Sequence, residues 1–440
     1  MGRSNMSGAS DTLAPEALRR GFRYFVGDGI CSQSMVTLTQ GAILVGFALR
    51  LGASDSVIGL LSAIIALTQL VQIPSIYIVE RFRARRRICV FASAGSRTFL
   101  LLMGAIPFLV SAQLGVALLL LALLLNASIA SVSSCSWNSW MHDLIPQDQL
   151  GSLFSKRIAL ATAVSIPLFI GTGLLVDNSR ILFPSFDITA YSLLFLFGFT
   201  AGMIGLFFLS HIPETRMTEA DMKRGFLRQI FQPFKDMNFR KLIIFLGVWN
   251  FAVNLASPFF TVYLLKVLGF EMSTVVIFSV LSLLMNIAFL QLWGRVADRF
   301  SNKSVLGVCG PLFVICILLW PFATMPAFQL LTIPMLAAIY LLVGISTAGT
   351  TLAAQNIGLK LAPSGKATAY LAANSFVSSI AAGFSPVLGG VLADTLAGTQ
   401  ITFQGFSFNN WDLVFILAVL VGVYSIHRLA KVQESGEVKE

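Results

Sequence analysis

Two charged side chains lie inside long apolar stretches of this sequence and are the first candidates for chemistry. Asp28 falls within the first stretch and Arg97 within the third. A charge near the middle of a membrane-spanning helix costs about 2.5–3.5 kcal/mol on insertion scales, so such residues are usually paired or functional. Asp28 is therefore a candidate proton-coupling carboxylate with Arg97 beside it. The alternative is that Asp28 and Arg97 form a purely structural ion pair.

Uncharged polar residues recur on one face of several apolar stretches. Gln33, Thr37 and Gln40 follow the spacing i, i+4, i+7 of a single helical face. A shift of 217 positions relates them to Asn250, Asn254 and Ser257, and relates Ser134 and Asn138 to Thr351 and Gln355. Polar groups at membrane depth face protein or water rather than lipid. The set predicts a shared hydrophilic cavity, and hydrogen bonding between helices is the alternative for any single residue.

Two tryptophans, Trp137 and Trp249, flank these polar positions. An indole ring can bind a cation through its face, and it can also stack on a sugar or an aromatic group. Uncharged polar groups outnumber charges on the same stretches. We therefore expect the cavity to bind a small neutral or zwitterionic organic molecule.

Motifs for enzymatic chemistry do not occur in the sequence. It contains no Gly-x-x-x-x-Gly-Lys-Ser/Thr phosphate loop and no His-Glu-x-x-His metal motif. The three histidines and five cysteines are scattered without metal-ligand spacing. The sequence thus predicts neither an enzyme nor a bound metal or cofactor.

The composition requires lipid around most of the chain. Of the 440 residues, 56% are hydrophobic and 11% are charged, whereas soluble domains carry about 25% charged residues. A spanning helix needs about 20 apolar residues, and these runs are too continuous for a β-barrel. The sequence predicts an all-α membrane protein with twelve spans, at 22–49, 55–79, 88–110, 114–142, 156–176, 190–211, 240–266, 272–293, 304–325, 329–358, 368–393 and 410–430.

The basic residues are distributed unequally between the two sides of the predicted membrane. Five arginines lie between residues 81 and 87, and the segment after the sixth span is also basic. The opposite side has only Arg50, Arg180 and Lys266. This asymmetry places both termini in the cytoplasm. The net charge of +10 is therefore a topology signal and a contact for anionic lipid, not a nucleic-acid site.

The second half of the sequence repeats the first. Gly173 and Asp177 coincide with Gly390 and Asp394 at the 217-residue shift. The predicted organisation is a cytoplasmic tail at 1–21, a six-helix bundle at 22–211, a cytoplasmic linker at 212–239, a second six-helix bundle at 240–430 and a tail at 431–440. The two bundles are expected to be pseudo-symmetric.

With these features the sequence resembles the major facilitator superfamily over nearly its whole length. Residues 294–303, GRVADRFSNK, are similar to the family's G-x-x-x-D-R-x-x-x-R/K loop motif. The copy after the second span departs from it, because Ile76 replaces Gly and Glu80 replaces Asp. Residues 383–390, GFSPVLGG, resemble the family's Gly-Pro-x-x-Gly-Gly helix signature. The resemblance gives gating or motif roles to Glu80, Arg81, Gly294, Asp298, Arg299, Lys303, Gly383, Pro386 and Gly390. Glu80, Arg81, Asp298 and Arg299 are candidates for a cytoplasmic latch between the bundles, and the alternative is that they are solvated charges flanking the spans.

The resemblance implies secondary transport by alternating access around a site between the bundles. In this family the first, fourth, seventh and tenth spans line the path, and acidic residues in the first span serve proton coupling in related transporters. We expect a monomer in a bacterial inner membrane that takes protons and a small organic solute. The alternatives are a proton-driven exporter of amphipathic compounds and a lipid translocator. An arginine expected within the fourth span of drug exporters is missing from residues 126–142, which disfavours the exporter.

Overall fold

The computed structural model describes residues 15–145, 147–182, 187–214, 232–324, 331–362, 367–399, 401–403 and 406–434. Twelve helices or helix pairs in these residues are long and apolar enough to cross a membrane. This confirms the predicted all-helical fold with twelve spans. Most of the predicted linker, residues 215–231, lies outside the described residues.

The first half contains six spans built from eight helices. Their bounds are α1 Pro15–Thr39, α2 Ala42–Arg50, α3 Asp55–Thr68, α4 Gln72–Phe82, α5 Arg85–Leu109, α6 Ala112–Leu144, α7 Gln147–Leu182 and α8 Asp187–Ser210, with the 3-10 turn Gln69–Val71 joining α3 to α4. The first span is divided between α1 and α2 because Gly41 has a φ of 59°, a conformation that glycine adopts without strain. Gln40 therefore lies at this break, not within a helix.

The second half repeats this plan. Its helices are α10 Met237–Val262, α11 Met272–Arg299, α12 Asn302–Leu319, α13 Thr332–Leu361, α14 Ala367–Thr395 and α15 Asn410–Leu429, with a π-helical turn at Tyr263–Val267 and 3-10 turns at Gln232–Lys235 and Trp320–Thr324. The strands β1 Ile401–Phe403 and β2 Phe406–Phe408 form an antiparallel hairpin before α15. This hairpin was not among the predicted elements.

Side chains at the helix starts show why several helices begin where they do. The hydroxyl of Ser54 accepts a hydrogen bond from the N–H of Val57 at the start of α3. Asp236 caps α10 through the N–H groups of Asn238 and Phe239. These side chains satisfy N–H groups that have no partner in the first turn of a helix.

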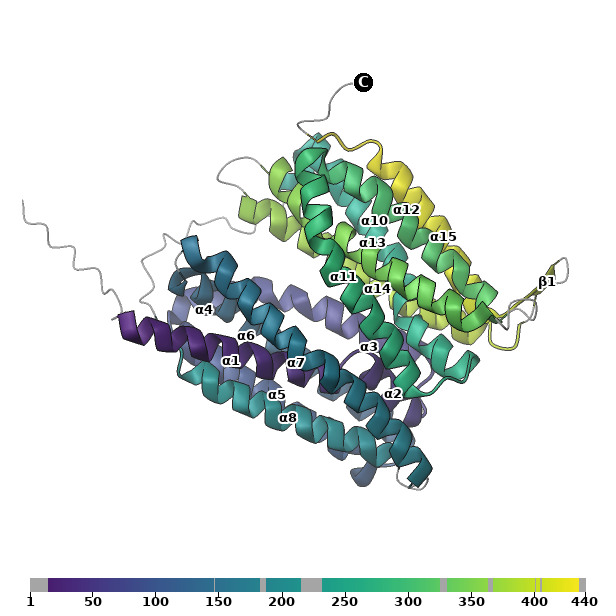
Figure 1. Cartoon of the computed structure of the whole chain (residues 1–440), viewed down its shortest axis with the longest axis horizontal. Coiled ribbons are helices and arrows are strands. Elements are labelled where there is room, and N and C mark those ends of the chain that lie inside the picture. The colour runs from purple at the N-terminus through teal and green to yellow at the C-terminus, as the bar shows by residue number, and fades with distance from the viewer. Residues whose placement is uncertain are drawn as a thin grey trace, which may run out of the picture.

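The two halves converge at the end of the molecule away from the termini (Figure 1). There α3 packs against α14, and α7 packs against α11. Glycines permit the close approach, because a Cβ on Gly390 would overlap the backbone of Asp55 and one on Gly173 would meet the backbone of Ser273. The larger apolar core includes Phe47 from the first half and Phe259 from the second.

Candidate functional site

An ion pair between Asp28 and Arg157 lies at the centre of the first half. Nη2 of Arg157 is 2.8 Å from Oδ2 of Asp28. Arg157 also donates through Nη1 to the backbone oxygen of Phe25, at 3.0 Å. Only 3% of Asp28 is exposed. Packing of α1 against α7 thus gives Asp28 a partner in the fifth span rather than the predicted Arg97.

Arg97 is connected to the same carboxylate through a hydroxyl. Nη2 of Arg97 donates to Ser32 Oγ at 3.3 Å, and Ser32 Oγ donates to Asp28 Oδ1 at 3.2 Å. Nη1 of Arg97 donates to the backbone oxygen of Gly202. Asp28 and Ser32 lie four residues apart on α1, so both reach the same face. The result is one partly buried hydrogen-bonded chain from Arg97 to Arg157.

Aromatic rings hold the guanidinium of Arg157 in place. Its central carbon lies 4.5 Å from the ring centroid of Phe25 and 4.8 Å from that of Trp137. The two rings are themselves stacked, with centroids 6.0 Å apart. A cation over an aromatic face gains about 0.5–2 kcal/mol, more where water is excluded. These contacts and the Asp28 carboxylate together fix the position of the Arg157 guanidinium.

A cavity of about 360 Å³ lies beside this chain of residues. Asp28, Arg97, Arg157, Ser134 and Trp137 line it, together with other hydroxyl groups of α5 and α6. An adjoining hollow of about 200 Å³ shares Ser32, Val36 and Arg157 with it and includes Gln33. The structure therefore brings together four of the predicted site residues, Asp28, Arg97, Ser134 and Trp137, and places Gln33 next to them.

The predicted residues of the second half are arranged differently. Asn250 donates to the backbone oxygen of Leu246 at 2.8 Å and to Ser378 Oγ at 3.3 Å. Asn254 donates to the backbone of Asn250 at 2.8 Å. Trp249 is 8% exposed and packs against Phe245 and Phe313. In this conformation the amide donors are used within α10 and toward α14, and Trp249 belongs to the aromatic core.

The remaining predicted polar residues do not join the cavity. Thr37 donates to the backbone oxygen of Gln33, and Ser257 donates to that of Val253. Asn138, Thr351 and Gln355 are exposed. Their roles in substrate binding stay predictions.

The predicted latch residues Glu80, Arg81, Asp298 and Arg299 form no ion pair with one another among the residues that the structure describes. Arg81 bonds to the hydroxyl of Tyr77 at 3.1 Å, and the guanidinium of Arg299 lies over the ring of Phe300 at 5.5 Å. The backbone N–H of Lys303 donates to Glu434. By contrast, Gly383 and Gly390 do lie at the contact between the halves, against Leu67 and Asp55.

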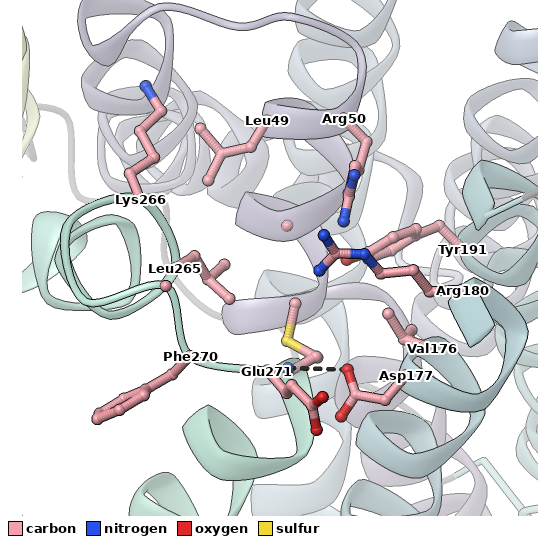
Figure 2. A pocket seen from close by; sticks show the side chains of 13 residues that line it. Leu49, Arg50, Val176, Asp177, Arg180, Tyr191, Leu265, Lys266, Phe270 and Glu271 are labelled. Carbon is pink, nitrogen blue, oxygen red and sulfur yellow. Dashed lines mark hydrogen bonds between the residues drawn. The ribbon is translucent and has the colours of Figure 1, made fainter. Parts of the chain in front are cut away.

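At the end of the molecule away from the termini, two carboxylates bridge the halves and close it. Asp394 accepts hydrogen bonds from the N–H groups of Asp55 and Ser56 at 3.1 and 2.8 Å. Asp177 accepts from those of Met272 and Ser273 at 2.9 and 2.7 Å. A cavity of about 350 Å³ lies at this end, and Figure 2 shows the side chains of Arg50 and Arg180 reaching into the same part of it.

Sequence reasoning missed Arg157 because the fifth span was predicted to begin at residue 156, which made Arg157 look like a flanking charge. The helix α7 in fact begins at Gln147. The repeat held a usable signal, since a shift of 217 positions relates Arg157 to Asn374. Asn374 accepts a hydrogen bond from Ser378, which in turn accepts one from Asn250. Asp177 and Asp394 were used to align the repeat but were given no role.

Comparison of the sequence with known families decides which fold family this is. The Major Facilitator Superfamily profile matches residues 29–386 and 284–435. The chain belongs to the Major Facilitator Superfamily. It is consequently an integral, multi-pass membrane protein. No curated protein matches its sequence.

Solved structures of other superfamily transporters share this fold. A mutant of the nucleoside transporter NupG has a TM-score of 0.72 at 13% identity, covering 94% of this chain and all of that chain. A bacterial homologue of the lysosomal transporter Spinster, in an inward-facing and unoccupied conformation, has a TM-score of 0.65 at 14% identity, covering 95% and 97%. A D-xylose–proton symporter has a TM-score of 0.63 at 13% identity, covering 97% and 98%. At these identities the likeness concerns the fold alone.

Proposed function

We propose that this chain is a proton-coupled secondary active transporter of a small organic solute, working as a monomer in a bacterial inner membrane with both termini cytoplasmic. The observation that carries the proposal is the buried Asp28–Arg157 ion pair beside the cavity of the first half. Asp28 is the one acidic residue among the described residues that line this cavity. The solved proton symporter of the same fold supports the coupling ion.

The arrangement of the halves supports alternating access. The carboxylates of Asp177 and Asp394 hold the halves together at the end away from the termini. At the other end Glu80, Arg81, Asp298 and Arg299 form no ion pair with one another in the part of the chain that the structure describes. With cytoplasmic termini, this is an inward-open state. Rocking of the halves would break the carboxylate contacts and expose the cavity to the other side.

In the proposed mechanism Asp28 is the proton carrier. The structure pairs its carboxylate with Arg157, and a proton on Asp28 would release Arg157 from this ion pair. Because removing one partner of a buried pair leaves an uncompensated charge, protonation and solute binding would be energetically linked. The proposed coupling of proton and solute thus depends on Asp28 and Arg157, which lie within hydrogen-bonding distance of each other.

Transport by purified protein in proteoliposomes with an imposed pH gradient tests the proposal. Wild-type protein should concentrate at least one solute of a compound panel against its gradient, and Asp28→Asn should lose concentration but retain downhill exchange. Glu271→Gln is the matched control. Glu271 lines the cavity at the closed end of the molecule and not the cavity beside Asp28. Proton-driven concentration by Asp28→Asn would show that Asp28 is not the coupling group.

A further inference from the structure

The charges around the cavity of the first half do not balance. Its described lining contains two guanidinium groups, on Arg97 and Arg157, and a single carboxylate, on Asp28. Asp28 forms its ion pair with Arg157. Among the described residues Arg97 has only neutral acceptors, the hydroxyl of Ser32 and the backbone oxygen of Gly202. The two guanidinium groups therefore share one carboxylate, which leaves one positive charge in excess, and Arg97 itself is 5% exposed.

An uncompensated buried charge is expensive, and more so at membrane depth. In Arg97 the cost is offset by hydrogen bonds to neutral groups and by the nearby Asp28 carboxylate, which is already paired with Arg157. A ligand that supplied one negative charge would neutralise the cavity. We infer that this cavity binds a small organic anion, a carboxylate whose oxygens pair with Arg97 and Arg157, in place of the neutral or zwitterionic molecule expected from the sequence. The inference rests on the proposed function, because it names the class of solute for the same cavity.

The rest of the lining suits such a ligand. Ser134 and Trp137 line the cavity, and the indole N–H of Trp137 has no acceptor in the described part of the chain. A planar carboxylate matches the forked donors of a guanidinium. The cavity volume of about 360 Å³ is near the lower end of the roughly 300–1,000 Å³ of small-molecule sites. These features favour a small anion with an apolar or aromatic body.

The repeat shows that the charges belong to one half only. The 217-residue shift relates Asp28 to Phe245, Arg97 to Val314 and Arg157 to Asn374. The second half therefore offers no equivalent ion-pairing group. A solute with a single anionic group, bound by the first half, fits this asymmetry.

The geometry also relates the sign of the solute's charge to the direction of coupling. When Asp28 is deprotonated it competes with a bound carboxylate for Arg157, and when it is protonated it does not. An anion and a proton would thus favour each other's binding, as symport requires. A cationic solute would instead compete with the proton for Asp28, as exchange requires. The assignment of an anion consequently predicts symport.

The test uses purified full-length protein in detergent, at a pH near 6, and matched probes that differ only in charge. The probes are benzoate, benzamide and benzylamine, nicotinate and nicotinamide, and lactate and lactamide. We expect one or more carboxylates to raise the apparent Tm and their amide or amine partners not to do so. Arg97→Gln should weaken this binding roughly 10- to 100-fold, as loss of a hydrogen bond to a charged group does. Arg180→Gln, in the other cavity, should bind like wild type.

The outcomes separate this inference from the proposed function. The anion assignment would be overturned if amides or amines raised the apparent Tm, or if no carboxylate of the panel did so. This measurement needs only the wild-type protein. Proteoliposomes could instead accumulate a neutral or cationic solute with a pH gradient, after correction for uptake by protein-free liposomes. That result would retain the proposed function and overturn the assignment of an anionic solute. Carboxylates that bind through Arg97 but are never concentrated by a pH gradient would retain the anion site and overturn proton coupling.

Discussion

Asp177 and Asp394 are equivalent residues of the two halves, and each carboxylate caps the first turn of a helix in the opposite half. Asp177, on α7, accepts from two N–H groups at the start of α11, and Asp394, on α14, accepts from two at the start of α3. The acceptor and donor positions are both related by the 217-residue shift. A carboxylate at a helix N-terminus satisfies free N–H groups and interacts favourably with the helix dipole. The two contacts therefore form one symmetric closure.

Removing one of these carboxylates should open the closed end. Each charged hydrogen bond contributes about 1.5–3 kcal/mol, so Asp394→Ala should shift the balance between closed and open states at least about tenfold. The measurement is labelling of a cysteine introduced at position 180, which lines the cavity at this closure. We expect the cysteine to be labelled faster in Asp394→Ala than in the unsubstituted background, by reagent added on the side opposite the termini. Asp177→Ala should have the same effect.

Glu271→Ala is the matched control for this closure. Glu271 lies at the same end and lines the same cavity, but its side chain does not cap α11. Its labelling rate should equal that of the unsubstituted background. Equal rates in Asp394→Ala and Glu271→Ala would show that the carboxylate does not hold the halves together.

A pair of glycines on α7 tests the steric side of the same contact. A Cβ on Gly173 would meet the backbone of Ser273, whereas one on Gly171 would have open space within 4 Å. Gly173→Ala should therefore disfavour the closed end and speed labelling there. Gly171→Ala should leave labelling unchanged and add up to about 1 kcal/mol of helix stability. Identical behaviour of the two variants would contradict the proposed close packing.

The fold could be predicted because its signals are local. A span is a run of apolar residues whose length is set by the bilayer, and the positions of Gly390 and Asp394 repeat those of Gly173 and Asp177. The break in the first span could not be placed in the same way. It depends on the backbone conformation of Gly41, and a lone glycine in a spanning helix does not specify a break.

The site could be predicted only in part because its contacts join distant helices. Asp28 and Arg97 were identified from their burial in apolar stretches, but the partner of Asp28 depends on which helix lies beside α1. That helix is α7, and it contributes Arg157. The stripe of Asn250 and Asn254 illustrates a second limit, because both amides donate to backbone oxygens one turn earlier. Sequence spacing alone does not distinguish such bonds from a cavity lining.

The C-terminal segment should make stability depend on pH. Glu434 accepts hydrogen bonds from Asn302 Nδ2 and from the backbone N–H of Lys303, both at 2.8 Å, and lies 3.2 Å from Lys360 Nζ. Burial acts to raise the pKa of Glu434, but the hydrogen bonds from Asn302 and Lys303 outweigh it and hold the pKa below its usual value. The unfolded chain therefore binds this proton more readily than the folded one.

The sign of the effect follows from this depressed pKa. Glu434 contributes stability above its ordinary pKa of 4.5, and the contribution is lost as the pH falls through the lower folded-state value. Glu434→Gln should lower the apparent Tm at pH 7, and the difference from wild type should shrink at pH 4 and below. A constant difference between pH 7 and pH 4 would exclude a contribution from ionisation of Glu434.

The interaction between Asp28 and Arg157 should be measurable as a coupling free energy in a double-mutant cycle. Arg157→Gln leaves Asp28 buried without its cation, which costs about 3–5 kcal/mol, so we expect a large fall in the apparent Tm. Asp28→Asn breaks the same contact, so the double variant Asp28→Asn/Arg157→Gln should lose less stability than the sum of the two single losses. Asp143→Asn with Arg157→Gln is the control, because Asp143 pairs with Arg85 instead. Additive losses in the Asp28 double variant would show that the two charges do not interact.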